Sequence, residues 1–328
     1  MKLLKLVPDD TNIPFLRWRN LAMAISMISI AASIILVIFR GLNFGVDFEG
    51  GQVVRVEFRQ APNIDQLRAE ISRTQAGDIN VQTFGSSGRD FAIRTPLPPG
   101  DKAAADRAAV RLVAAIRAQH PDATLSSVDT VSGKVSGELF RTGAVSLALA
   151  MLAISIYIWF RFEWQFGVGA LFALFHDVSL TFGFFALTQL EFNLNIVAAL
   201  LTIIGYSLND TIVVYDRIRE NLRKYRKLDI VSLLDLSVNE TLSRTVMTSL
   251  FMLLALVVLL GLGPDVIFGF TAAMLLGIFV GTYSSIYMAA PILVWLKVGP
   301  DSFVPLPGTD GAVPKPAVVE DKNAGAVV

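Results

Sequence analysis

Residues 20–39 read NLAMAISMISIAASIILVIF, a stretch that contains no charged side chain. A helix of about 20 mostly apolar residues is long enough to cross the hydrocarbon core of a bilayer. The stretch therefore predicts a membrane-spanning helix, which we place at residues 20–40. It is too long for the apolar part of a signal peptide and is not followed by a small-x-small cleavage site, so we expect it to be retained.

Five further stretches of the chain have the same apolar character. They lie at residues 139–160, 164–190, 192–215, 244–263 and 266–296. With the first helix they predict a polytopic α-helical membrane protein that has six transmembrane helices. Pro291, close to the end of the last stretch, predicts an end or a kink of that helix.

The composition of the chain agrees with a membrane protein and excludes several other classes. Of its 328 residues 53% are hydrophobic and 17% are charged, against roughly 45–50% and 25% in soluble domains. Because 28 basic residues balance 28 acidic ones, the chain has no field of one sign, and we expect no nucleic-acid partner. The absence of cysteine and the presence of only two histidines exclude Cys/His zinc sites, so no metal is expected.

The positions of the basic residues predict the orientation of the chain. Residues 1–19 contain four Lys or Arg, and the connection at 216–243 contains six. Segments rich in Lys and Arg remain in the cytoplasm, so both regions and both termini are predicted to be cytoplasmic. Within this connection, residues 228–238 predict either an amphipathic helix at the membrane interface or a packed surface helix. The Pro-rich tail at 297–328 is predicted to be disordered.

Residues 41–138, on the opposite side of the membrane, have the composition of a soluble domain. Alternating and helical patterns predict strands at 52–58, 79–84, 91–95 and 124–131, with helices that begin at Asn63 and Asp101. The order β-α-β-β-α-β is typical of a ferredoxin-like α+β domain. No cluster of titratable residues indicates catalysis in it, so we expect a module that contacts a partner or a substrate.

Four ionisable residues stand out within the predicted transmembrane helices: His176, Asp177, Asp210 and Arg244. A charge at the bilayer centre costs several kcal/mol, so these side chains must face protein or water. Burial favours the protonated form of Asp210, whereas a nearby Arg244 favours the ionised form. A movement that separates the two residues would therefore bind or release a proton, which is the minimum chemistry of a proton-coupled device.

The neighbours of Asp210 are small or polar and could support this chemistry. Ser207, Asn209 and Thr211 allow helices to approach closely and keep a carboxylate hydrated, so we include them with Asp177 and His176 as supporting candidates. A purely structural alternative remains open for each aspartate. Asp210 and Arg244 would then be a buried ion pair, and Asp177 would be satisfied locally by His176 and Ser179.

Three motifs of the chain, in the expected order, resemble the SecF family, the smaller membrane subunits of SecDF protein-export complexes. They are FGVDFEGG at 44–51, NDTIVVYDRIRE at 209–220 and SRT at 243–245. A fourth stretch, GKVSGEL at 133–139, extends the likeness, which covers residues 15–297. The first motif opens the soluble domain and contains Gly45, Asp47, Gly50 and Gly51.

The resemblance implies a function that the composition and the spacing do not supply. Such a chain is half of an RND-type transporter and pairs with a homologous SecD half in the bacterial inner membrane, with its large domain in the periplasm. The complex uses inward proton flow, without another cofactor, to help pull a preprotein out of the SecYEG channel, and it can recruit small accessory membrane subunits. Asp210 and Arg244 correspond to the membrane aspartate and arginine of the family. The resemblance implies a proton-driven subunit rather than an enzyme.

Three other functions share some of these features. An intramembrane aspartyl protease would pair Asp177 with Asp210, but such enzymes usually carry Gly-x-Gly-Asp, and residues 207–210 read SLND here. An RND-type transporter of small molecules or lipids would have the same membrane aspartate and would differ in its partners. A purely structural membrane anchor would tolerate the loss of the Asp210 charge.

Overall fold

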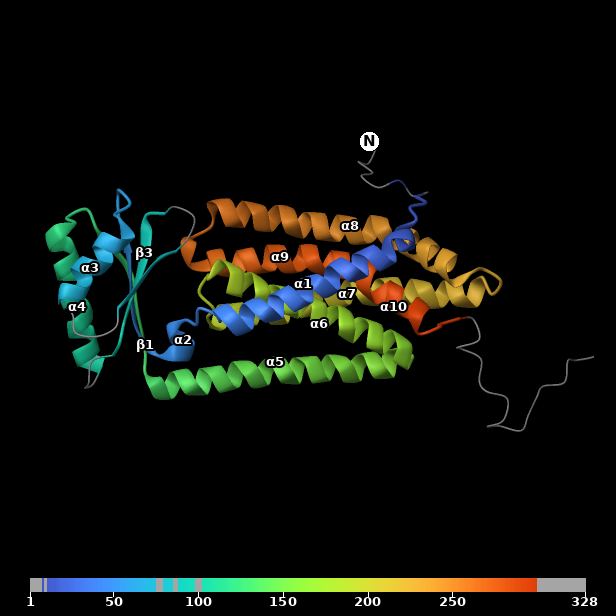
Figure 1. Ribbon diagram of the computed structural model, residues 1–328, viewed down its shortest axis with the longest axis horizontal. Coiled ribbons are helices and arrows are strands. Elements are labelled where there is room, and N and C mark those ends of the chain that lie inside the picture. Colours follow the sequence, from blue (N-terminus) through green and yellow to red (C-terminus); the bar gives the residue numbers. More distant parts are fainter. Residues whose placement is uncertain (1–7, 9–10, 75–78, 85–87, 98–101, 300–328) are drawn as a thin grey trace, which may run out of the picture.

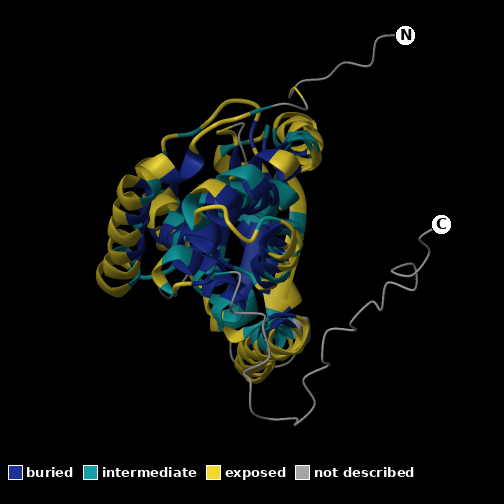
Figure 2. Ribbon diagram, turned by 90° about the vertical axis from the view of Figure 1, so that its right-hand side faces the viewer, coloured by how far each residue is buried: buried dark blue, intermediate teal, exposed yellow. Residues whose placement is uncertain are grey.

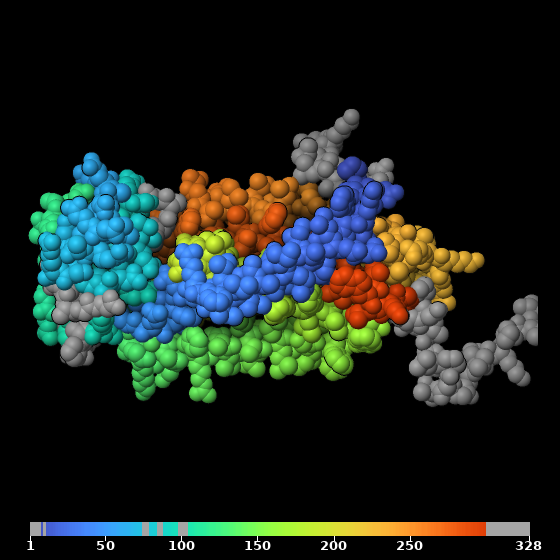
Figure 3. All heavy atoms as spheres, viewed as in Figure 1, coloured from blue at the N-terminus to red at the C-terminus, as the bar shows by residue number. Residues whose placement is uncertain are grey.

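The computed structural model describes residues 8, 11–74, 79–84, 88–97 and 102–299. These residues form an elongated molecule in which a helical bundle carries an α+β domain at one end (Figures 1 and 3). The bundle contains the apolar helices, and the domain lies between the first and second of them along the chain.

Six helices of the described chain are long and apolar enough to cross a membrane, which confirms a multi-pass helical protein. The first comprises the short 3-10 helix η1 (Phe15–Trp18) and α1 (Arg19–Arg40). The next four are α5 (Gly133–Arg161), α6 (Trp164–Thr188), α7 (Leu194–Lys224) and α8 (Ile230–Leu262). The last comprises the short 3-10 helix η2 (Asp265–Ile267), α9 (Phe268–Ser284), a π-helix (Ser285–Ala289) and α10 (Ala290–Trp295).

Helices α6 and α7 form the centre of the bundle. In the most apolar part of each of these two helices 56% of the residues are buried, against 11% in α5 and 17% in α8. Figure 2 shows the outer helices with exposed faces around a buried centre. Because these exposed faces are apolar, they suit contact with lipid or with other helices rather than with water.

Glycines allow two pairs of helices to approach closely. A Cβ atom at Gly183 of α6 would lie 2.2 Å from Ser33 Oγ of α1, and one at Gly277 of α9 would lie 2.4 Å from the Ile203 side chain of α7. Small residues at such contacts are typical of membrane helices, which associate through close packing.

The two helices on either side of the basic connection, α7 and α8, are longer than the sequence predicts. Residues 216–243 are not a loop, because α7 continues to Lys224 and α8 begins at Ile230. Asp229 caps α8 by accepting hydrogen bonds from the Val231 and Ser232 amides, so the helix starts before the apolar stretch. Within residues 228–238, Leu233 and Leu234 are buried in the bundle core, as the packed-helix alternative requires.

Two other helix boundaries also differ from the prediction. Helix α5 begins at Gly133 rather than at residue 139, because the Ser132 side chain caps its first turn through the Val135 amide. Pro291 does not end the last helix. It lies at the start of α10, directly after the π-helix, whose wider turn accommodates a residue that has no N–H to donate.

The domain has the element order that the sequence predicts. Its elements are β1 (Gly51–Glu57), α3 (Ile64–Thr74), β2 (Asn80–Phe84), β3 (Asp90–Thr95), α4 (Lys102–Gln119) and β4 (Thr124–Val131). The four strands form an antiparallel sheet in the order β2-β3-β1-β4. One face of the sheet, including Val54 and Val56, packs against Leu67 of α3 and Leu112 of α4. The predicted disordered tail lies, from residue 300 onward, outside the described residues.

Candidate functional site

Asp177 lies at the centre of the bundle and joins three helices. Its Oδ1 atom is 2.8 Å from Nδ1 of His176, and its Oδ2 atom accepts hydrogen bonds from the hydroxyls of Ser207 on α7 and Ser284 on α9. All four side chains are buried. Ser179, the local partner that the sequence suggested, is not among those three donors. The carboxylate is therefore held mainly by tertiary contacts.

Further hydroxyls continue this polar region across the bundle. Ser249 on α8 lies 2.7 Å from Thr282 Oγ1 on α9 and accepts a hydrogen bond from Tyr206 on α7 at 3.2 Å. On the other side of Asp177, the His176 ring lies against the ring of Tyr283, whose hydroxyl contacts α1 through the Ala22 carbonyl oxygen. Polar side chains thus connect α1, α6, α7, α8 and α9 within an apolar bundle.

Asp210 lies one helical turn beyond Ser207 on α7 and is 3% exposed. Its carboxylate faces Ser249 of α8, the helix that also carries Arg244. The Oδ2 atom is buried and has no hydrogen-bond partner. A buried acceptor without a partner is rare, because leaving it unsatisfied costs about 1–3 kcal/mol. Asp210 thus differs from Asp177, whose two carboxylate oxygens both have hydrogen-bond partners.

Arg244 is exposed and does not neutralise Asp210 by direct contact. The ion pairs formed within the described ranges do not join the two residues, so the purely structural pair is not formed in this conformation. Asp177 contacts His176 and two serines rather than Asp210, so the carboxylate pair of an aspartyl protease is not formed either.

The other supporting candidates have different positions. Thr211 is buried and donates its hydroxyl to the Ser207 carbonyl oxygen within α7. Asn209 is exposed, so its side chain lies on another face of the helix. Among the residues whose placement the structure describes, no group of three or more His, Asp or Glu side chains could hold a metal ion.

The glycine-rich motif at 44–51 forms the joint between the domain and the bundle. Gly45 donates its amide to the Phe192 carbonyl oxygen, and Asp47 accepts a hydrogen bond from the Leu194 amide at the start of α7. Between Gly45 and Gly50 the chain makes one helical turn, α2 (Val46–Glu49), which the sequence did not predict. Gly51 has a φ of +116°, and a Cβ there would lie 3.0 Å from the Thr95 carbonyl oxygen, so a side chain at this position would be strained.

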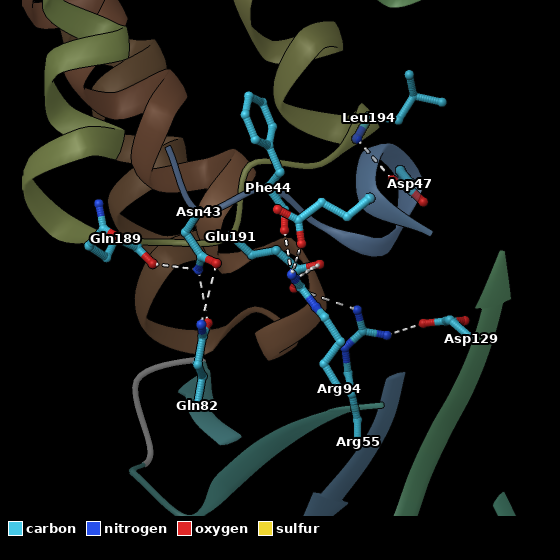
Figure 4. A network of polar contacts seen from close by, with 11 residues as sticks. Asn43, Phe44, Asp47, Arg55, Gln82, Arg94, Asp129, Gln189, Glu191 and Leu194 are labelled. Atoms are coloured by element: carbon cyan, nitrogen blue, oxygen red, sulfur yellow. Dashed lines mark hydrogen bonds and ion pairs between the residues drawn. The ribbon is translucent and has the colours of Figure 1, made fainter. Parts of the chain in front are cut away.

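Glu191, in the connection between α6 and α7, links the bundle to the sheet (Figure 4). Its carboxylate oxygens lie 3.7 Å from Arg94 of β3 and 3.9 Å from Arg55 of β1. Arg94 also binds Glu49 of α2, and Arg55 pairs with Asp129 of β4. These arginines thus connect the motif, the sheet and the end of the bundle.

A second link lies beside the first one. The side-chain amide of Asn43 donates to the side-chain oxygen of Gln82 on β2 at 2.9 Å and to the Gln189 backbone carbonyl oxygen at 2.8 Å (Figure 4). The amide of Phe192 donates to the Asn43 carbonyl oxygen. These polar contacts hold the domain to the bundle together with an aromatic cluster, in which the rings of Phe44 and Phe48 pack against those of Phe140 on α5 and Phe192.

The substitution Glu191→Gln is expected to loosen this joint. It removes the charge that faces two arginines, and partly exposed ion pairs of this kind contribute up to about 1 kcal/mol. We expect faster hydrogen exchange at the Gly45 and Phe192 amides, measured by mass spectrometry. The control is Glu49→Gln, which removes a more exposed partner of Arg94. Equal hydrogen-exchange rates at these amides in the two variants would contradict a special role of Glu191 in the joint.

Sequence reasoning missed Ser284, Ser249, Arg94 and Arg55. A serine or threonine in an apolar helix is common, and nothing local indicates which one meets a carboxylate from another helix. Glu191 had one signal, because it is a charged residue between two apolar stretches, but its partners lie almost 100 or more residues away in the chain.

Comparisons with known proteins assign the chain to a family. The C-terminal model of the SecD/SecF protein export membrane proteins matches residues 112–299, and the SecD/SecF GG motif matches residues 35–62. The chain is 43% identical to the protein translocase subunit SecF of Cereibacter sphaeroides, over 90% of this chain and 93% of that one. It is 45% identical to the subunit SecF of Rhodobacter capsulatus, over 89% and 91% of the two chains.

A solved structure agrees with this assignment. The crystal structure of SecDF, a translocon-associated membrane protein from Thermus thermophilus, matches with a TM-score of 0.79 and 35% identity. The match covers 88% of this chain but 39% of that one, so this chain spans well under half of the SecDF chain. A super-membrane-facing form of SecDF matches with a TM-score of 0.65. With its GG motif at the domain joint and SecF relatives along nearly its whole length, the chain belongs to the SecD/SecF family and is a SecF subunit of the protein translocase.

Proposed function

We propose that this chain works with a SecD half and uses the proton motive force to drive late stages of preprotein export through SecYEG. Protons are its coupling ion, and it needs no other cofactor and catalyses no covalent step. Preprotein, SecYEG and small accessory membrane subunits are the other partners in this proposal. The likeness to the Thermus thermophilus SecDF, a single chain of which 39% is matched, supports the pairing with SecD.

The observation that carries this proposal is the environment of Asp210. Its carboxylate is buried in the bundle with one oxygen unpartnered, while Arg244 on the next helix remains exposed. A movement of α8 relative to α7 would change the distance between the two charges and with it the affinity of Asp210 for a proton. One charge that crosses 100 mV releases about 2.3 kcal/mol, which is enough to shift a two-state equilibrium substantially.

The proposed placement in the membrane follows from charge and shape. The exposed basic residues around the end of α7 indicate the cytoplasmic side, where both termini would lie. The domain at the other end of the bundle would then be periplasmic. We assign it to the ferredoxin-like class, because the strand order β2-β3-β1-β4 with two helices on one face is that of a split β-α-β unit.

Membrane vesicles that contain SecYEG, the cognate SecD half and this chain test the proposal. A preprotein is first trapped in the channel with ATP, the ATP is removed, and a proton gradient is then applied. We expect the gradient to complete export only in vesicles that contain the chain, and a protonophore to abolish the effect. Equal completion without the chain, together with gradient-driven transport of a lipid or small molecule, would favour the RND transporter alternative.

A further inference from the structure

A cleft separates the domain from the end of the bundle. Its volume is about 460 Å³, within the range of roughly 300–1,000 Å³ that is usual for ligand sites. The domain contributes Ile64 and Arg68 of α3 and residues 81–83 of β2. The bundle contributes residues 188–191 between α6 and α7 and residues around Val266 between α8 and α9. A chain that passes between the bundle and the domain would meet this cleft.

The wall formed by β2 is the free edge of the sheet. Within the described residues, β2 lies at the end of the strand order and pairs only with β3. Its register with β3 is regular along its whole length, and its sequence NVQTF contains neither proline nor a charged residue. Edge strands are usually protected by such residues or by bulges, because an open edge pairs with other chains. The opposite edge differs, since β4 carries Asp129 and its pairing with β1 is irregular.

The backbone of β2 presents hydrogen-bonding groups to the cleft. The Arg68 guanidinium donates to the Val81 carbonyl oxygen at 3.4 Å from the side of α3, so this oxygen points away from β3. In an antiparallel pair the N–H and C=O of one residue point to the same side, and the side alternates along the strand. Thr83 therefore has the same orientation as Val81, and both residues line the cleft.

The remaining walls do not select one kind of side chain. Arg68 and Glu191 supply charges of both signs, whereas Val266 is 60% exposed and supplies an apolar surface. Walls of mixed character next to a free strand edge suit a ligand that is recognised through its backbone and whose side chains vary. An extended polypeptide has these properties.

We propose that this cleft binds a translocating polypeptide in extended form, which adds to the free edge of β2 through Val81 and Thr83. The inference rests on the proposed function, which supplies an unfolded chain of any sequence on this side of the membrane. The bound segment becomes an additional strand of the sheet, so the domain holds the polypeptide by its backbone. An edge strand of the SecD half is the competing occupant, and crosslinking separates the two.

Photo-crosslinking in the assembled complex identifies the occupant. Benzoylphenylalanine is placed at position 83 or 266, and at position 110 as the control, because Val110 is 69% exposed on α4 but does not line the cleft. A preprotein trapped in SecYEG is then irradiated. We expect adducts with the preprotein from positions 83 and 266 and none from position 110.

A proline at position 83 tests the role of the strand edge. Thr83→Pro removes the outward N–H, and the sheet tolerates it because this N–H does not bond β3. The matched control is Thr83→Val, which keeps the N–H and suits a strand. We expect Thr83→Pro to reduce the preprotein adduct at position 266 by about fivefold or more and to slow gradient-driven export, whereas Thr83→Val behaves as the wild type. Circular dichroism and co-isolation with SecD confirm that both variants fold and assemble.

The remaining outcomes overturn the inference. Adducts with SecD alone at position 83 would mean that the partner occupies the edge. Adducts from all three positions would mean non-specific contact, and an adduct at position 266 that survives Thr83→Pro would exclude strand addition. In each of these cases the proposed function still stands if the proton gradient drives export only in the presence of the chain, so the two failures are distinguishable.

Discussion

Asp210→Asn is expected to reduce proton-driven completion of export by about tenfold or more while the protein still inserts and assembles with its partner. The substitution keeps the volume of the side chain and removes the group that binds the proton. Without that group the roughly 2.3 kcal/mol per charge available from a 100 mV potential is no longer coupled to the chain, and about 1.4 kcal/mol corresponds to a tenfold change. The measurement is the rate of completion in vesicles that contain SecYEG, SecD and the variant chain.

The matched control lies on the same helix. Asp216→Asn removes a charge from an aspartate near the C-terminal end of α7, where its 43% exposed side chain pairs with Arg161. Exposed pairs of this kind contribute little, so we expect rates close to those of the wild type. An Asp210→Asn variant that exports at the control rate would contradict the proton-binding role. The alternative of a purely structural membrane anchor would then be favoured.

The coupling of Asp210 with Arg244 has its own measurement. If the two residues act as a unit, Arg244→Gln reduces export strongly in the wild type and has little further effect in the Asp210→Asn background. Strictly additive losses in the double variant would mean that the two residues contribute independently, and the exposed Arg244 would then act elsewhere.

Asp177→Ala is expected to cause the largest loss of stability among single substitutions in the bundle. The change removes the acceptor for His176, Ser207 and Ser284, and of these buried groups Ser284 can still donate its hydroxyl to the Gly281 carbonyl oxygen. Breaking a buried polar network of this kind costs about 3–5 kcal/mol. We expect a markedly lower midpoint of thermal unfolding in detergent, followed by far-UV circular dichroism, which reports the loss of helix.

Ser179→Ala is the control for Asp177→Ala. Ser179 is buried on the same helix but is not among the hydrogen-bond partners of the Asp177 carboxylate, so its loss is expected to have a small effect. Asp177→Asn should lie between the two, because the amide keeps one acceptor. If Asp177→Ala unfolds at the same temperature as Ser179→Ala, the three-helix network is not what holds α6, α7 and α9 together.

Local patterns in the sequence are sufficient for the outline of the fold. Each apolar stretch predicts its own helix, because transfer into lipid depends on the composition of one segment and on little else. The element order of the domain follows in the same way from alternating and helical periods. The boundaries are less predictable: caps such as Ser132 and Asp229 start α5 and α8 before the apolar residues do.

The candidate site was also predicted in part: the sequence indicated which residues belong to it but not what they contact. The rarity of charge in apolar segments identified Asp210, Arg244, Asp177 and His176, since burial of a charge is costly wherever it occurs. Their different states could not be read from the chain. Asp177 accepts hydrogen bonds from hydroxyls on two other helices, whereas Asp210 has one oxygen without a partner. Arg244 is exposed.

The sequence by itself thus determined which segments enter the membrane, the order of elements in the domain and which ionisable residues need an explanation, because these depend on local hydropathy and period. Only the tertiary structure decided that Ser284 meets Asp177, that Glu191 holds the sheet through Arg55 and Arg94, and that β2 is the open edge beside a cleft. Such contacts join residues far apart in the chain, and they depend on how whole helices and strands pack.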